Sequence, residues 1–329
     1  KARRGPSASH EADLAWRDQL SGLDEATIDQ VGHVAGLDTI VVITGETGTG
    51  KTRLSRIIHE LSPRKQRPFL AVNCGAISES LLDSELFGHV KGAFTGADHN
   101  YLGRLAQCAD GTLLLDEIDS LSPAAQVRLL QVVEDRVFQP VGSTEMRPLE
   151  ARLIVASNKS LDEEVNAGRF RADLYYRLNV ITFHLPPLRD RPQQVIDLAE
   201  QFSETFSRHH GFEVPSMMPL ARFALESYGW PGNIRELRNV MERAVILAAG
   251  KTIEPAHLPP GMLRVLDGPA AEWTTDTTTN KLADARVRAE REQLLQALSR
   301  NQNNRSKTAL DLGISRVALY KRLRKFHIL

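Results

Sequence analysis

The chain has 329 residues, enough for about two domains that each bury a core of their own. A hydrophobic content of 42% and a charged content of 25% are typical of a globular protein, and no apolar stretch approaches the roughly 20 residues of a membrane span, so we expect no membrane partner. Only Cys74 and Cys108 are present, without CxxC spacing, which favours buried thiols in a reducing, cytoplasmic compartment over a disulfide or a metal cluster.

The net charge of zero conceals an asymmetry along the chain. Residues 281–329 hold twelve of the 41 Lys and Arg and four of the 41 Asp and Glu, a balance of +8. The rest of the chain therefore carries −8. A basic tail on an acidic body favours contact with a polyanion, and a solvated basic helix is the alternative.

Short apolar runs alternate with helical patterns after a polar, weakly helical start over residues 1–35. This alternation predicts an α/β fold in which helices cover both faces of a parallel sheet. The predicted strands are 39–44, 68–72, 112–115, 152–156 and 180–185, and the predicted helices are 52–61, 79–86, 123–134 and 192–210.

The pattern becomes all-helical from about residue 187 to 260, including a helix over 233–249. Residues 259–280 have the Pro, Gly and Thr content of a linker, and the basic tail follows. We therefore predict an N-terminal segment 1–35, an α/β subdomain 36–186, a helical subdomain 187–260, a linker 261–280 and a DNA-binding domain 281–329.

The most specific motif is GETGTGKT, which fits GxxxxGK[ST] between an apolar strand and a helix. The glycines let backbone N–H groups close on phosphates, Lys51 reaches the β- and γ-phosphates of ATP, and Thr52 ligates Mg²⁺. A chance glycine-rich turn is the alternative, and the strand and helix on either side count against it. The predicted ATP-binding residues of this loop are Gly45, Glu46, Thr47, Gly48, Thr49, Gly50, Lys51 and Thr52.

Two acids, Asp116 and Glu117, end the apolar strand LLL. Asp116 would hold Mg²⁺, and Glu117 would polarise the attacking water. Such a pair alone more often caps a helix or a turn. The phosphate loop upstream favours the catalytic interpretation.

Several segments occur in a fixed order between residues 39 and 258: GETGTGK, ESELFGHVKGAFTGA, GTLLLDEI, FRADLYYRLNV and WPGNIRELRNV. Together they resemble the central AAA+ domain of the NtrC-type bacterial enhancer-binding proteins, the activators of sigma-54 RNA polymerase. The resemblance implies an AAA+ P-loop NTPase with a five-stranded parallel sheet, a helical lid, ATP and Mg²⁺ as ligands, and assembly into a ring, most simply a hexamer.

The GAFTGA segment is similar to the loop with which this family contacts the sigma factor. Its two glycines allow flexible turns, its one aromatic residue can anchor in an apolar site, and it carries no charge. Without the family, an ordinary surface loop would be the better interpretation. The predicted sigma-contacting residues are Gly92, Ala93, Phe94, Thr95, Gly96 and Ala97.

The resemblance also assigns catalytic roles outside the phosphate loop. Arg171 and Arg177 match arginines that reach the γ-phosphate of a neighbouring subunit, and we favour Arg177 over Arg171. Asn73 matches the partner of the catalytic glutamate, Asn158 the γ-phosphate sensor, and Arg235 the lid arginine at the nucleotide. On their own, the two asparagines would be strand-end caps.

The chain departs from the family pattern near the adenine base. The I-G-x-S-like segment expected before the first strand has no match within residues 9–32, which leaves the adenine side of the pocket without assigned residues. Thr47 also stands where Ser is usual.

The basic tail contains NRSKTALDLGISRVALYKRLRKF at residues 304–326. Ala309, Gly313 and Leu319 have the spacing of the small residue, the tight turn and the core leucine of a helix-turn-helix. Its helices would span 305–312 and 316–326, the second entering the major groove. A preceding helix over 283–298 would supply leucines to the core or to a dimer contact. An amphipathic hairpin that serves only assembly is the alternative.

This tail resembles the Fis-type domain at the C-terminus of the same activators. The match places Ser315 and Arg316 at base edges and Tyr320 and Lys321 near the DNA backbone. Ala318 stands where Thr is common, so one hydroxyl contact is missing.

We therefore predict an ATP-driven activator that binds upstream double-stranded DNA and remodels sigma-54 RNA polymerase. One alternative is a DNA-binding regulator whose degenerate ATPase domain serves only assembly, and an intact phosphate loop and Glu117 count against it. A general AAA+ helicase or unfoldase is another, and the GAFTGA segment counts against that. Because the chain begins with Lys1 rather than Met, we expect a longer protein with a sensory domain upstream.

Overall fold

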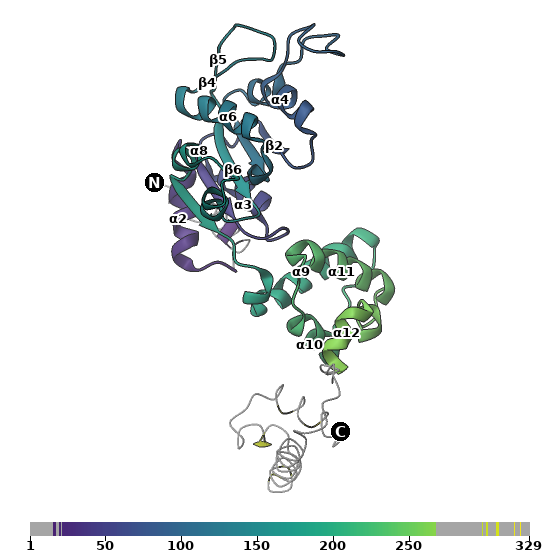
Figure 1. Cartoon of the computed structure of the whole chain (residues 1–329). Helices are drawn as coiled ribbons and strands as arrows, with labels where there is room; N and C mark the ends of the chain where they lie inside the picture. The colour runs from purple at the N-terminus through teal and green to yellow at the C-terminus, as the bar shows by residue number, and fades with distance from the viewer. Residues whose placement is uncertain are drawn as a thin grey trace, which may run out of the picture. The chain divides into compact units, whose positions relative to one another are not determined.

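The computed structural model describes residues 22–267 continuously, together with positions 16, 17, 20, 298, 301, 307, 308, 319 and 323. Its centre is a parallel sheet of five strands in the order β2-β3-β6-β1-β7 (Figure 1). The predicted parallel sheet is confirmed, and each predicted strand agrees with the observed one within two residues at either end. The strands are β1 (Val41–Thr44), β2 (Phe69–Asn73), β3 (Thr112–Asp116), β6 (Arg152–Ser157) and β7 (Ile181–His184).

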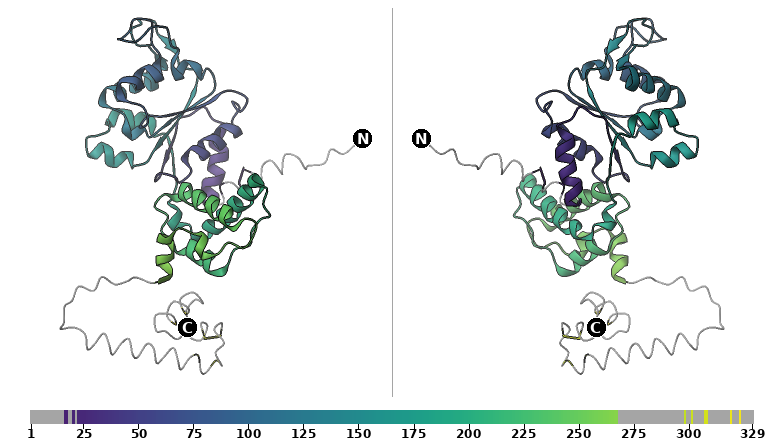
Figure 2. Two further views of the ribbon diagram at one scale, coloured as in Figure 1. Left: turned by 90° about the vertical axis from the view of Figure 1, so that its right-hand side faces the viewer. Right: turned by 90° about the vertical axis from the view of Figure 1, so that its left-hand side faces the viewer.

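The strands are apolar throughout because both faces of the sheet are covered. Leu113 and Leu115 of β3 pack into one apolar cluster, whereas Leu114 packs into the cluster on the opposite face. Alternate side chains of a strand point to opposite faces, so a sheet buried on both sides needs continuous apolar runs. Figure 2 shows helices on both sides of the sheet.

Each face is covered by its own set of helices. Those that contribute buried residues to the first cluster are α4 (Glu79–Phe87), α5 (Gly103–Gln107), α6 (Pro123–Asp135), α7 (Leu161–Asn166) and α8 (Ala172–Leu178). Those that contribute to the second cluster are α2 (Glu25–Ala35) and α3 (Lys51–Leu61).

Helix α2 lies where the sequence predicted no core element. It begins after Asp24, whose carboxylate accepts a hydrogen bond from the N–H of Thr27 at 2.8 Å. Its last carbonyls, of Val34 and Ala35, accept hydrogen bonds from the guanidinium of Arg152, which is 2% exposed. The first residue of β6 therefore caps the C-terminus of α2.

A short hairpin was also not predicted. Strands β4 (Val137–Phe138) and β5 (Arg147–Pro148) pair antiparallel, and both lie near the top of Figure 1. The loop between them contacts the chain just after α4, since the N–H of Val90 donates to the carbonyl of Val141 at 3.1 Å.

The region after β7 is helical, as predicted. It contains α9 (Pro192–His210), α10 (Pro219–Ser227), α11 (Asn233–Ala248), η3 (Pro255–His257) and α12 (Pro260–Asp267). The bounds of α9 coincide with the predicted 192–210. Helix α12 begins where a linker was predicted, because proline fits the first turn of a helix and Met262 is buried.

Contacts divide the chain into two compact units. The first comprises Lys1–Met217 with Tyr228–Ile253, so α9 and α11 belong with the sheet. The second comprises Met218–Ser227 with Glu254–Leu329, which holds α10, η3 and α12. The predicted segment boundaries stay predictions. Among the described residues, no helix combines the length and apolarity needed to cross a membrane.

Candidate nucleotide site

The polar residues of the site gather at the carboxyl edge of the sheet. Thr44 of β1 lies beside Ser157 of β6, and Asp116 of β3 lies beside Asn73 of β2. Open α/β sheets bind ligands outside the carboxyl ends of their strands. The residues that directly follow β1, β3 and β6 are therefore the ones placed to meet a ligand.

The phosphate loop, residues 45–50, joins β1 to α3 and is tightly constrained. Gly48 has a backbone φ of +82°, and a Cβ at that position would lie 2.4 Å from the carbonyl oxygen of Gly232. Only glycine fits such a conformation beside another backbone. The loop ends at Lys51, the first residue of α3, as a phosphate-binding strand–loop–helix requires.

Lys51 is only 6% exposed, and its amine is held inside the loop. It donates to the carbonyl oxygens of Gly45 at 2.6 Å and Glu46 at 3.0 Å, and to Asn158 Oδ1 at 2.7 Å. Burial lowers the pKa of Lys51, and the nearby carboxylate of Asp116 acts in the opposite direction. Because all three acceptors are neutral, a bound phosphate would bring this cation its first direct anionic partner.

The two predicted metal ligands lie together. The Thr52 hydroxyl donates to Asp116 Oδ2 at 3.3 Å, from the first turn of α3 to the end of β3. A hydroxyl and a carboxylate are hard oxygen donors of the kind Mg²⁺ takes, so the residues fit that ion.

Glu117 directly follows β3 in a left-handed conformation, with φ of +57°. Non-glycine residues in this region are uncommon and concentrate at functional sites. Its carboxylate rests against Gly75, where an added Cβ would lie 2.3 Å from Glu117 Oε2. The chain therefore turns Glu117 out of the strand direction, beside Asp116.

Asn158 is fixed by an acid that the sequence analysis missed. Asp119 Oδ1 accepts hydrogen bonds from Ser157 Oγ at 3.0 Å and from the Asn158 N–H at 3.2 Å. The Asn158 side chain then points its oxygen at Lys51. The third acid in DEID was the signal that sequence reasoning could have used.

Asn73 lies at the right place for its predicted role but has another task in this structure. Its side-chain oxygen accepts from the N–H groups of Gly75 and Ala76, both at 2.9 Å, and so caps the turn after β2. Pairing with Glu117 stays a prediction. Cys74 follows it as a free, buried thiol, as predicted, and burial raises its pKa to about 12.

Residues from the helical region close the other side of the phosphate loop. The guanidinium of Arg189 forms two hydrogen bonds with the carboxylate of Glu46, at 2.6 and 2.9 Å. Asn233 donates to Thr47 O and to Glu46 Oε2. Arg235 is close as well, since a Cβ on Gly48 would lie 3.2 Å from its Cβ. Arg189 and Asn233 were not predicted.

The GAFTGA loop, residues 92–97, lies outside this site. It is closed by the N–H of Gly92 donating to Ala97 O at 2.9 Å. The Phe94 ring packs edge-on to the imidazole of His89, with centroids 5.0 Å apart, and 39% of the residue stays exposed. The one aromatic residue of the loop, predicted to anchor in an apolar site, thus keeps part of its ring open to a partner.

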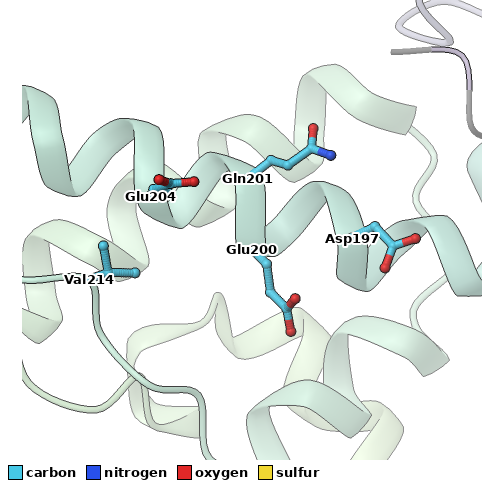
Figure 3. Close-up of a pocket in the computed structure, with 5 residues that line it drawn as sticks. All are labelled: Asp197, Glu200, Gln201, Glu204 and Val214. Carbon is cyan, nitrogen blue, oxygen red and sulfur yellow. The ribbon is translucent and has the colours of Figure 1, made fainter. Parts of the chain in front are cut away.

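A separate hollow lies along α9 and does not contain predicted site residues (Figure 3). Asp197, Glu200, Gln201 and Glu204 of α9 line it together with Val214. Three carboxyl groups would repel the phosphates of a nucleotide. The phosphate loop therefore remains the candidate nucleotide site of the described residues.

Comparison with known proteins identifies the family. Residues 21–184 match the family described as "Sigma-54 interaction domain", residues 189–272 match "AAA+ ATPase lid domain", and residues 286–326 match "Bacterial regulatory protein, Fis family". The sigma-54-dependent transcriptional regulator SfnR of Pseudomonas fluorescens is 41% identical over 92% of this chain and 86% of its own length. The chain belongs to the sigma-54-dependent transcriptional regulators.

Other regulators of this family are similar over less of their length. The transcriptional regulatory protein ZraR of Klebsiella oxytoca is 44% identical over 91% of the chain. The chain spans 66% of the length of that relative. Crystal structures of NtrX from Brucella abortus share the fold: the complex with ADP has a TM-score of 0.71 at 28% identity and covers 94% of this chain and 71% of NtrX. NtrX was also solved with ATP.

The two predicted arginine fingers of this sigma-54-dependent regulator lie directly before α8 and on it, away from the described partners of Lys51. Arg171, the residue before α8, pairs with Asp173 in the first turn of that helix at 2.6 Å, and Arg177 of α8 pairs with Glu134 of α6 at 2.9 Å. Both arginine side chains are largely exposed, at 44% and 61%. Their placement leaves them accessible to a second subunit.

The tail of this regulator is a Fis-type helix-turn-helix domain, as predicted. The structure does not describe the four predicted DNA-contacting residues, Ser315, Arg316, Tyr320 and Lys321. Of the three predicted tail helices it describes only single positions. Among those positions Leu298, Leu319 and Leu323 are buried. Burial of Leu319 confirms its predicted place in the core.

Proposed function

We propose that this chain is the ATPase and DNA-binding part of an activator that assembles as a ring and uses ATP to remodel sigma-54 RNA polymerase. One observation carries the proposal. The groups needed to bind and cleave a triphosphate converge on one sheet edge, while an uncharged loop of the same subdomain lies outside it, with every residue except Ala97 at least partly exposed. The converging residues are Lys51, Thr52, Asp116, Glu117 and Asn158.

Each converging residue has a role that its contacts support. The Lys51 amine would exchange its neutral acceptors for phosphate oxygens. Thr52 and Asp116 would hold Mg²⁺, which when bound neutralises charge on the β- and γ-phosphates. Glu117, turned out beside them, would orient the attacking water. Asn158 would sense the γ-phosphate through its hydrogen bond with the amine of Lys51.

Hydrolysis would be completed at a subunit boundary. Among the described residues, the exposed guanidinium groups of Arg171 and Arg177 pair with surface carboxylates, so a second subunit can exchange those partners for the γ-phosphate at little cost. A cation supplied in trans stabilises charge in the transition state. This arrangement requires an oligomer, which we propose is a hexameric ring.

Coupling to the polymerase would pass through the GAFTGA loop. It has no acid, base or phosphate-binding group, so it cannot take part in the nucleotide chemistry. Thr95 is exposed, and Phe94 offers a partly exposed apolar surface to a protein partner. We propose the sigma factor as this partner, in keeping with the name of the matching domain.

DNA binding would bring the ring to its promoters. The Fis-type domain would place Arg316 at a base edge and Lys321 at a phosphate. Arg316→Ala should weaken binding to the cognate site more than to random duplex, by roughly 1–3 kcal/mol, whereas Lys321→Ala should weaken both alike. Equal loss on both duplexes for Arg316→Ala would place it at the backbone.

The function as a whole is tested by promoter opening. Sigma-54 polymerase on a supercoiled promoter should form open complexes when the chain and ATP are added, and Lys51→Ala should abolish this without abolishing DNA binding. DNA binding without ATP-dependent opening, even with the upstream part of the protein restored, would favour the alternative regulator whose AAA+ domain serves assembly.

A further inference from the structure

One short segment of the helical region holds the outer side of the phosphate loop. Asn233 Nδ2 donates to Thr47 O at 3.0 Å and to Glu46 Oε2 at 3.1 Å. The next N–H, of Ile234, donates to Gly48 O at 2.9 Å. Three consecutive residues of the loop are thus bound by two consecutive residues at the start of α11.

Asn233 is built into this position from both sides. It is fully buried, and its Oδ1 accepts from the N–H of Leu188 at 2.8 Å, so every polar atom of the carboxamide group has a partner. Its backbone is left-handed, with φ of +51°, a conformation that asparagine tolerates better than most residues. One side chain therefore ties together the phosphate loop, α11 and the segment after β7.

These bonds set the direction of the loop's amide groups. In a trans peptide the C=O and the following N–H point in opposite directions. Because Asn233 binds the carbonyl of Thr47 from the side of α11, the N–H of Gly48 is turned away from α11. Phosphate loops bind phosphate oxygens through backbone N–H groups of this kind.

The same side chain also controls a negative charge in the loop. A free Glu46 carboxylate would repel a triphosphate. Arg189 pairs with it through two hydrogen bonds and Asn233 adds a third, and these bonds lower the pKa of Glu46 to about 2. Glu46 is therefore ionised, and the positive charge of Arg189 compensates its negative charge. The pair holds the carboxylate on the side of the loop that faces the helical region.

We propose that Asn233, with the Glu46–Arg189 pair, positions the phosphate loop for ATP and ADP and keeps Arg235 beside it. Asn233 acts through the loop and is a positioning residue rather than a catalytic one. The proposal rests on nucleotide binding at this loop, as proposed above. It makes the start of α11 part of the binding site even though Asn233 itself is buried.

Asn233→Gly is the cleanest test, because glycine keeps the left-handed backbone and removes only the side-chain bonds. In the full chain we expect KM for ATP, and the dissociation constant for ADP by calorimetry, to rise about tenfold while kcat changes less than about threefold, since binding common to ground and transition states affects KM. Val240→Ala is the matched control, because Val240 is buried in the same helix and is absent from these bonds. It should lower the melting temperature and leave KM unchanged.

Exchanging the donor of Asn233 and the acceptor of Glu46 tests the direct contact between these two side chains. Asn233→Asp places an oxygen against the Glu46 carboxylate and should raise KM more than Asn233→Gly does. Glu46→Gln restores a donor there, so the Asn233→Asp, Glu46→Gln double variant should bind ATP more tightly than Asn233→Asp alone.

The outcomes separate the two proposals. A wild-type chain that neither binds nor hydrolyses ATP would overturn the proposed function. If the wild type is active but Asn233→Gly keeps its KM, or Val240→Ala raises KM equally, or Glu46→Gln gives no relief, the positioning role of Asn233 is wrong and the proposed function stands.

Discussion

The chain contains two glycine-rich loops that differ in what surrounds them. In the phosphate loop, a Cβ added to Gly45 or Gly48 would lie 2.5 or 2.4 Å from a backbone oxygen. In the GAFTGA loop, a Cβ added to Gly92 or Gly96 would meet nothing within 4 Å. Both loops hold glycines at positive φ, but only in the phosphate loop does neighbouring backbone leave no room for a side chain at these glycines.

This difference assigns a task to each loop. The phosphate loop is bound by Arg189, by the start of α11 and by its own lysine, so its groups are fixed before a nucleotide arrives, as preorganised chemistry requires. The GAFTGA loop is held mainly by bonds within itself and to its base, which leaves its apex open to a partner. A substitution that disables one loop should therefore leave the task of the other intact.

The largest effect is expected from Glu117→Gln. The change keeps the size of the side chain and removes the carboxylate that orients water, so hydrolysis should fall by about 10²–10⁴-fold. The bonds of the phosphate loop are untouched, and ATP binding should persist. Phosphate release and nucleotide titration on one preparation check both parts, and hydrolysis near the wild-type rate would remove Glu117 from the mechanism.

Equivalent substitutions in the two loops should have unequal results. Gly48→Ala forces a Cβ toward Gly232 O at a left-handed position, and roughly 1–3 kcal/mol of strain would weaken ATP binding by about 5- to 150-fold. Gly96→Ala strains a backbone of φ +98° but meets no neighbour, and because its loop lies outside the nucleotide site it should leave KM and kcat within about twofold. Equal losses of ATP binding would contradict the separation of the loops.

A smaller effect, the recovery of ATPase activity on mixing two inactive variants, tests whether Lys51 and Arg177 of different subunits act at one site. Lys51→Ala and Arg177→Ala chains should each be inactive, yet a mixture should regain activity, because about one interface in four joins an intact lysine to an intact arginine. The measurement is ATPase activity against mixing ratio, in rings shown to exchange subunits. No gain over the separate variants would count against a role of Arg177 in trans.

The sequence predicted the parts of the fold that follow from apolar pattern alone. All five strands of the sheet and helix α9 were found, because buried parallel strands are short apolar runs and a long amphipathic helix has a clear period. Helix α2 was missed although Ile28, Val31 and Val34 have helical spacing, because the surrounding residues are polar. The cap supplied by Arg152 is a tertiary contact that local sequence does not contain.

The site was predicted unevenly for the same reason. Lys51, Thr52, Asp116 and Glu117 stand in contiguous motifs, so their proposed roles could be predicted from the order of residues along the chain. Arg189 lies 143 residues from its partner Glu46, and the left-handed conformation of Asn233 depends on bonds to other segments. Such contacts arise from packing, so a pattern along the chain does not predict them.

The separation of chemistry from coupling is tested most directly by Thr95→Ala. Thr95 lies in the open loop, far in sequence from every group that binds Lys51, so the variant should keep ATP hydrolysis and oligomer formation. The measurement is open-complex formation by sigma-54 polymerase, with phosphate release followed on the same preparation. The account predicts normal phosphate release without promoter opening. Normal promoter opening alongside normal hydrolysis would contradict it.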